Sequence, residues 1–338
     1  MDKLIRGWST VPRSKTEYLY GQWVPFILVA AALLISIISC RQSTLVSPLP
    51  APALPSRQTS AVSPPPADLQ RETLMGRRIY AMNVNSSREL IARLHEFNLW
   101  GKVQEDVPSV IIEHFPADLA LVDLSRKKKA FVRALLPVVM VVREEVMLER
   151  QRLLTVINEL GGPRGLTFYP GRQEWQTAIA REQVLFINEL CRKYRTEDAE
   201  ELLNRVNVLP VSLMLAQGAI ESSWGSSRFA NQANNLFGMW TWGKKGLVPA
   251  RRAANQSHKI AIYDSVLDSV RAYMLTINRV GAYADLRRIR RHSMDAAAVA
   301  EGLLNYSARK GFYVTSLQSL IKNNNLESYD NCRLVDAG

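Results

Sequence analysis

The chain has 338 residues, a length that accommodates one to three domains, and its 47% hydrophobic and 22% charged content excludes wholesale disorder. The formal net charge of +12 indicates an acidic partner, such as nucleic acid, anionic lipid or an anionic polymer. Three cysteines and four histidines lack metal-ligand spacing, which argues against a disulfide scaffold and a structural zinc site.

The first forty residues have the pattern of an export signal or membrane anchor. A basic flank containing Lys3, Arg6, Arg13 and Lys15 precedes an apolar run over residues 23–38. A basic flank before an apolar segment is oriented with its positive end in the cytoplasm. Because an exported protein does not meet chromosomal nucleic acid, we expect no nucleic-acid partner.

The apolar run ends at Cys40, and its last residues resemble the lipobox of bacterial lipoproteins, in which the cysteine is lipidated. The alternative is a plain signal anchor whose cysteine is incidental, although sixteen residues are short for a spanning helix. In both cases we expect the protein in the bacterial cell envelope, on the periplasmic side and tethered to a membrane.

Residues 41–70 carry seven of the 16 prolines, which predicts a semi-extended linker. In polyproline II form it reaches up to roughly 90 Å from the membrane. Residues 71–125 mix short apolar runs with turn residues and predict a small α/β or irregular accessory module of unknown role.

Residues 126–194 predict a helical extension that precedes the main domain. A long helical pattern opens with four basic residues at 126–129 and runs to residue 160, before Gly161 and Gly162. The basic run is either a solvated helix start or a contact for an anionic polymer. A second helix is predicted over residues 173–194, and Asp198 supplies an N-cap for a third that ends before Pro210.

The next helix carries the most informative residues. Ser212 is predicted to cap it, and Met214, Gln217, Gly218 and Glu221 share one face by helical spacing. A carboxyl above the space left by Gly218 and beside the Trp224 indole would be poorly solvated. Desolvation would raise its pKa and make Glu221 a proton donor near neutral pH. The alternative is a surface glutamate at a helix end.

Four motifs occur together in this part of the chain: E-S-S-W-G at 221–225, N-N-L-F-G-M at 234–239, Y-D-S-V-L-D-S-V at 263–270, and Tyr306 followed by Tyr313. Their combination and order resemble the glucosaminidase family of peptidoglycan hydrolases, glycoside hydrolase family 73, and within it the Bax-like branch. The resemblance implies a catalytic domain over residues 195–335. The implied fold is mainly α and lysozyme-like α+β, with a small β-hairpin lobe near residues 238–263.

The resemblance also implies the function, an endo-β-N-acetylglucosaminidase that cleaves peptidoglycan glycan strands without a cofactor or metal. Glu221 matches the catalytic acid, and Tyr306 matches the tyrosine near the acetamido group of the sugar. The remaining candidates are aromatic and turn residues that would bind substrate: Trp224, Asn235, Phe237, Trp240, Trp242, Tyr263 and Tyr313. Core packing is the competing use of Phe237 and Trp224.

One departure from the usual glycosidase pattern stands out. Residues 239–263 contain no aspartate or glutamate, whereas most glycosidases use two carboxylates. Either the acetamido group of the substrate attacks the anomeric carbon, or a distant residue such as Asp264 activates water. Two alternative functions also stay open: a lytic transglycosylase, and a catalytically silent module that binds or scaffolds the cell wall.

The redox state of the last two cysteines is open as well. If Cys40 is lipidated, Cys191 and Cys332 either pair in an oxidising compartment or remain buried free thiols.

Overall fold

The computed structural model describes residues 70–74, 76–102, 104–162, 179–249, 257–304, 306 and 310–337. The predicted export segment, Cys40 and most of the proline-rich linker lie outside these residues. Within the described ranges, no helix combines the length and the apolar character needed to cross a membrane. The described chain is mostly helical with small, short-stranded sheets, which confirms the α-dominated fold class.

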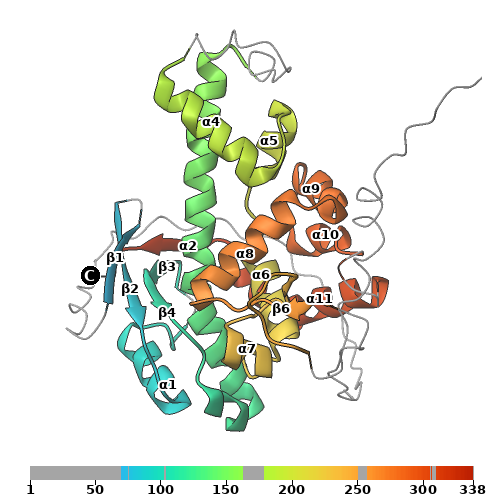
Figure 1. Ribbon diagram of the computed structural model, residues 1–338. Helices are drawn as coiled ribbons and strands as arrows, with labels where there is room; N and C mark the ends of the chain where they lie inside the picture. The colour runs from blue at the N-terminus through green and yellow to red at the C-terminus, as the bar shows by residue number, and fades with distance from the viewer. Residues whose placement is uncertain are drawn as a thin grey trace, which may run out of the picture.

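A small sheet forms one side of the molecule (Figure 1). Strand β1 (Gln70–Leu74) pairs antiparallel with β2 (Arg77–Met82), and β2 pairs in parallel with β4 (Val110–Ile112). The register of the parallel pair places Tyr80 opposite Val110.

The connection from β2 to β4 contains the helix α1 (Ser87–Glu96) and the strand β3 (Asp106–Pro108), and the 3₁₀ turn η1 (Ala117–Leu121) follows β4. Strand β3 pairs in parallel with β7 (Arg333–Val335), which lies near the C-terminal end of the chain. The two ends of the described chain are therefore joined by backbone hydrogen bonds.

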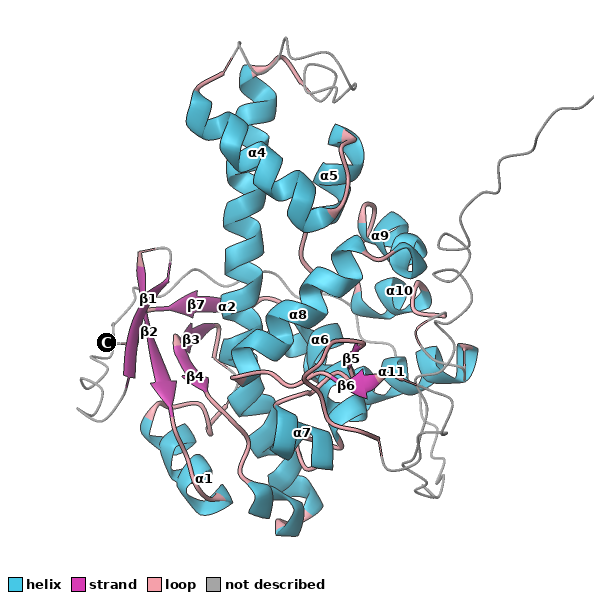
Figure 2. Cartoon of the chain, viewed as in Figure 1, coloured by secondary structure: helices cyan, strands magenta, loops and turns pink. Residues whose placement is uncertain are grey.

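The helix α2 (Leu124–Glu159) runs through the middle of the fold, between the sheets and the remaining helices (Figure 2). The Asp123 carboxylate accepts a hydrogen bond from the Arg126 amide and caps its N-terminus. All residues from 130 to 142 are buried, because this half of α2 packs against β4 and against two helices described below. The helix predicted over residues 126–160 is confirmed.

The second half of α2 extends beyond the main core and is covered by α4 (Arg181–Tyr194) and α5 (Ala199–Arg205). These three helices share a separate cluster of buried residues, in which Leu153, Leu190 and Leu202 are fully buried or nearly so. The Asp198 carboxylate accepts from the Glu201 amide, so the predicted N-cap is confirmed. The first residues of the predicted 173–194 helix lie outside the described chain.

The C-terminal half of the chain forms the other side of the molecule. Its first helices are α6 (Val211–Ser222) and α7 (Arg228–Ala233). Strand β5 (Trp240–Thr241) then pairs antiparallel with β6 (Lys259–Ile260), which provides the small hairpin predicted near residues 238–263. The elements that follow are α8 (Val266–Arg279), η3 (Gly281–Tyr283), α9 (Ala284–Arg290), α10 (Ala296–Glu301), α11 (Gly311–Asn323) and η4 (Leu326–Tyr329).

One continuous hydrophobic core connects these parts. Its buried residues extend from Ile79 in β2 to Ala337, and α2 contacts α6 and α8 within it. Residues 71–125 therefore share their core with the C-terminal helices. The boundaries of the predicted domains stay predictions.

The two described cysteines are both free and half-buried, so the pairing of Cys191 with Cys332 is wrong. Cys191 packs against the cluster shared by α2, α4 and α5, whereas Cys332 packs against the main core. The Cys332 thiol donates to the Gln104 carbonyl at 3.3 Å, and burial raises the pKa of Cys191 to about 12. Each thiol therefore has its own packing site.

The N-terminus of α6 is capped by a residue far away in sequence. The prediction that Ser212 is the N-cap is wrong, because Pro210 holds that position and makes no side-chain cap. Instead, the Asp330 carboxylate accepts from the Ser212 amide at 2.8 Å and from the Ser212 hydroxyl at 2.6 Å. A carboxylate at this end also interacts favourably with the helix dipole.

We predict that Asp330→Ala lowers the free energy of unfolding by about 2 kcal/mol, since it leaves a buried amide and hydroxyl without their acceptor. Urea unfolding followed by circular dichroism measures this loss. Glu327→Ala is the matched control, because it removes the same charge from an exposed position in η4. Equal losses in the two variants would contradict the capping role.

Candidate active site

Glu221 is the second-last residue of α6, and the backbone turns sharply directly after it. Ser223, Trp224 and Gly225 all have positive φ angles of 52°, 60° and 75°. The Ser222 hydroxyl fixes this turn by donating to the Gly218 carbonyl at 2.5 Å and accepting from the Gly225 amide at 2.7 Å. Three successive left-handed residues are costly and persist only where the surroundings hold them.

Two glycines of α6 and its turn allow close contact with α2. A Cβ atom at Gly218 would lie 3.0 Å from Leu135, and one at Gly225 would lie 2.9 Å from Phe131. The prediction that Gly218 leaves a space for the Glu221 carboxyl is therefore wrong. The glycine faces α2, because the two helices cross closely at this point.

A chain of hydrogen bonds leads to the Glu221 carboxyl from the core. The Tyr273 hydroxyl donates to Gln217 Oε1, and Gln217 Nε2 donates to the Tyr313 hydroxyl at 3.3 Å. The Tyr313 hydroxyl donates in turn to Glu221 Oε1 at 2.9 Å. Each donor points toward the carboxyl, so the chain stabilises its ionised form.

The surroundings of the carboxyl act in the opposite direction. Tyr273, Tyr306 and Tyr313 are buried, and the last two rings stack with their centroids 5.3 Å apart. Burial raises the pKa of Glu221 to about 7, and the hydrogen bond from Tyr313 opposes part of this rise. No described residue is recorded bonding to Oε2, so this oxygen can carry a transferable proton.

Two of the predicted site residues, Tyr306 and Phe237, are buried in the core. Tyr306 is 1% exposed and its hydroxyl donates to the Phe237 carbonyl at 3.1 Å. Phe237 is fully buried and stacks on Tyr273 at 4.0 Å. Both rings therefore contact the core in this structure.

Asn235 is also a structural residue. Its side-chain amide donates to the carbonyls of Met239 and Ala261, and its oxygen accepts from the Met239 amide. These bonds close the base of the hairpin. The substrate-binding role of Asn235 stays a prediction. The neighbouring Asn234 also has a structural role, since its side-chain amide donates to the carbonyls of Tyr263 and Asp264.

Trp224 packs toward the first turns of α2. Its ring meets Phe131 edge to face at 5.9 Å, and the Lys128 ammonium lies 5.1 Å from its centroid. The recorded contacts of the indole are thus with α2. We expected this indole to keep water away from Glu221. Four buried tyrosines also interact with the carboxyl, and its charge raises the pKa values of their hydroxyl groups: Tyr273, Tyr283, Tyr306 and Tyr313.

The hairpin carries the accessible aromatic residues. Trp242 is 70% exposed, and its ring lies 6.3 Å from that of the half-buried Trp240. Trp240 stacks on His258 with centroids 4.1 Å apart. Tyr263, at the end of the hairpin, is half-buried, and burial raises the pKa of its hydroxyl to about 12. This face offers flat rings to a ligand.

Gln217, Tyr273 and His258 were not predicted as site residues. Gln217 carried a signal, since a polar side chain one helical turn before Glu221 shares its buried face. Tyr273 and His258 had none, because their partners lie elsewhere in the sequence. Among the described residues, no group of three or more His, Cys, Asp or Glu side chains could hold a metal ion.

Comparisons with known proteins cover the site. Residues 196–326 match the family model described as glucosaminidase, mannosyl-glycoprotein endo-beta-N-acetylglucosaminidase. The chain is similar to the Bax protein of Escherichia coli (strain K12), at 27% identity over 215 residues, covering 59% of this chain and 70% of that protein. A shorter similarity, 41% identity over 64 residues, links it to the exo-glucosaminidase LytG of Bacillus subtilis (strain 168), covering 19% of this chain and 21% of LytG.

A solved structure, the catalytic domain of the autolysin Auto from Listeria monocytogenes, covers 48% of this chain and 98% of its own. Its sequence identity is 23% and its TM-score is 0.30. The segment that matches the family model contains Glu221, Gln217, Tyr273 and Tyr313, and therefore the whole hydrogen-bond chain.

We predict that Glu221→Gln changes how stability depends on pH. Burial raises the pKa of Glu221 from its ordinary value of 4.5 to about 7, so wild-type stability falls as the pH rises through this interval. The amide variant lacks this loss and should be more stable than wild type above pH 7, by up to about 3 kcal/mol.

Chemical unfolding at pH 4 and pH 8 measures the difference. Glu301→Gln, at an exposed position in the C-terminal turn of α10, is the control and should leave the pH dependence as in wild type. A Glu221→Gln protein that gains no stability relative to wild type at pH 8 would show that the carboxyl is well solvated.

Proposed function

We propose that residues 196–326, which match the glucosaminidase family model, form a domain of that family, and that the protein is a glycoside hydrolase that cleaves peptidoglycan glycan strands as an endo-β-N-acetylglucosaminidase. The observation that carries the proposal is the Glu221 carboxyl, which has a pKa near 7 and lies in the matched segment. We place this domain in a lysozyme-like architecture, consistent with its helical core and small hairpin.

Glu221 is the proposed general acid. Cleavage of a glycosidic bond needs a proton on the leaving oxygen, and a carboxylic acid with a raised pKa supplies it near neutral pH. Tyr313 holds Oε1 and thereby fixes the orientation of the carboxyl, which leaves Oε2 as the donor atom. The tyrosine cluster keeps the acid protonated, and the turn after α6 presents it at the end of the helix.

The second chemical group remains the main question about the mechanism. In the described chain, no carboxylate is recorded in contact with Glu221, and Asp264 is exposed at the far end of the hairpin. We propose that the acetamido oxygen of the substrate attacks the anomeric carbon, as in substrate-assisted glycosidases. In this route Asp264 makes no direct contribution to bond cleavage.

The aromatic face of the hairpin is the proposed sugar platform. Flat rings cover the apolar faces of sugars while polar neighbours bind the hydroxyl groups. Trp242 is the candidate for direct contact, since it is exposed, and Trp240 with His258 supports it from one side. Tyr263 extends the same face toward α8.

A lytic transglycosylase is the second candidate. Such an enzyme needs one acid, because a hydroxyl of the substrate itself attacks the anomeric carbon, and this chain has a single candidate acid at the site. The products differ: hydrolysis leaves a reducing N-acetylglucosamine end, whereas transglycosylation leaves a 1,6-anhydro-muramic end. The family model is named for an endo activity and LytG for an exo activity. The lengths of the released glycan fragments distinguish the two.

A catalytically silent cell-wall module is the third candidate. The absence of acidic residues from 239–263 favours it, and turnover of purified sacculi would remove it. For the location, we propose the periplasmic side of the cell envelope, with the protein tethered through residues 1–40 or lipidated Cys40, as the sequence predicts.

We predict that Glu221→Gln lowers the turnover of purified sacculi by ~10²–10⁴-fold, the usual contribution of a general acid. Release of glycan fragments, with product ends assigned by mass spectrometry, measures the loss and the reaction type together. Asp264→Asn is the matched variant, and substrate assistance predicts that it keeps activity within about a factor of ten. A folded Glu221→Gln protein with more than a tenth of wild-type activity would place the acid elsewhere.

We predict that Tyr313→Phe moves the alkaline limb of the rate profile to higher pH. The protonated carboxyl is the active form, and the hydrogen bond from Tyr313 lowers the pKa of Glu221. Removal of this bond raises the pKa by up to about one unit, and the limb moves with it. The pH dependence of kcat/KM on soluble glycan strands measures the shift, and a limb that moves to lower pH would contradict it.

A further inference from the structure

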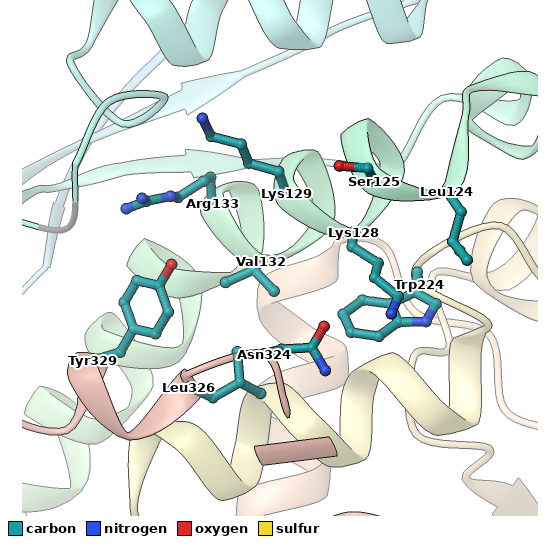
Figure 3. A pocket seen from close by; sticks show the side chains of 10 residues that line it. All are labelled: Leu124, Ser125, Lys128, Lys129, Val132, Arg133, Trp224, Asn324, Leu326 and Tyr329. Atoms are coloured by element: carbon teal, nitrogen blue, oxygen red, sulfur yellow. The ribbon is translucent and has the colours of Figure 1, made fainter. Parts of the chain in front are cut away.

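A pocket of about 560 Å³ lies between the first turns of α2 and residues 324–329 (Figure 3). Trp224 is at one end of it, three residues after Glu221 in the sequence, but Glu221 itself does not line the pocket. In Figure 3, Lys128 extends toward the Trp224 ring, and Arg133 and Tyr329 lie at the opposite end.

The lining of this pocket is basic. Lys128, Lys129 and Arg133 lie on one stripe of α2, and no acidic residue lines the pocket. In the described chain, none of the three forms a recorded ion pair; Lys128 and Lys129 contact the rings of Trp224 and Trp100 instead. The described lining thus carries three basic side chains and no acidic one.

The buried guanidinium of Arg133 is the strongest feature of the pocket. Arg133 is only 7% exposed, its one recorded hydrogen bond runs from Nη2 to the Gly101 carbonyl at 2.8 Å, and it lies 5.4 Å from the centroid of Tyr329. A buried charge is costly unless an opposite charge or several acceptors satisfy it. Its remaining N–H groups can bind a planar anion such as a carboxylate.

The helix end itself does not call for an anion, because the Asp123 carboxylate already caps α2. The positive charge of the pocket therefore comes from its side chains. The apolar side chains of Val132 and Leu326 lie between the charged ends and can cover a short aliphatic segment.

We propose that this pocket binds the carboxylates of the peptide stems that branch from peptidoglycan, an inference that rests on the proposed function. The sugars of the glycan strand are neutral when the stems are attached, and the stems carry the carboxylates and short aliphatic side chains. A stem bound here places its charge on Lys128, Lys129 and Arg133 while the strand lies at the Glu221 end of α6. The accessory residues of the chain thus select strands that still carry their peptides.

Binding of a soluble disaccharide tetrapeptide, measured by titration calorimetry, tests this inference. The protein used is Glu221→Gln, which does not consume the ligand, and the same fragment with its carboxylates converted to amides is the comparison. We expect the Lys128→Gln, Lys129→Gln double variant to bind the native fragment about tenfold more weakly and the amidated fragment unchanged. Lys127→Gln, one residue away and outside the pocket lining, is the single-charge control and should bind as the parent protein does.

Equal binding of native and amidated fragments by the parent protein would overturn the inference. So would an equal loss in the Lys127→Gln control, or binding of anionic phospholipid vesicles with no binding of the fragment. Digestion of sacculi by the wild-type protein tests the proposed function separately. If the protein cleaves sacculi but binds the native and amidated fragments equally, only the peptide-stem inference is wrong. If it binds the native fragment more tightly but does not cleave sacculi, only the proposed hydrolase activity is wrong.

Discussion

The Glu221 carboxyl is held between two opposing influences, and the rest of the site is arranged around their balance. Burial favours the neutral acid, while the hydrogen bond from Tyr313 favours the carboxylate. Because Tyr313 is itself oriented by Gln217, and Gln217 by Tyr273, the core of the domain reaches the acid through three hydrogen bonds. The balance leaves the pKa near neutrality, where an acid can both hold and release its proton.

The same site depends on a helix that precedes the matched family segment. Phe131 and Leu135 of α2 press against the two glycines of α6 and its turn, and no larger residue fits at either point without a shift. The left-handed turn after Glu221 is thus supported from outside the segment that matches the family model. In this chain, the position of the acid is determined jointly by the domain and by the long helix in front of it.

Much of this arrangement could be predicted from the sequence. The helical pattern that opens at residues 126–129 and stops before Gly161 located the long helix, and the E-S-S-W-G motif located Glu221 at a helix end. What the sequence could not give were the partners of single side chains: Gly218 faces α2, Trp224 packs on Phe131, and Phe237 stacks on Tyr273. These contacts join residues far apart in sequence, as does the bond between Tyr313 and Glu221, which are 92 positions apart. Local periodicity carries no information about such pairs.

The pairing of β3 with β7 has a consequence for how the chain acquires its structure. Asp106 and Arg333 form an ion pair across this sheet although 227 positions separate them. Nearby, the Ala337 amide donates a hydrogen bond to the Ser109 hydroxyl. Closure of so long a loop is entropically costly and slow, so β3 cannot gain its partner strand until nearly the whole polypeptide has emerged from the ribosome. Since α2 joins this sheet to the α6 turn, assembly of the acid site is coupled to the last strand. A chain that lacks β7 would therefore contain every residue of the candidate site without the strand that completes this sheet beside α2.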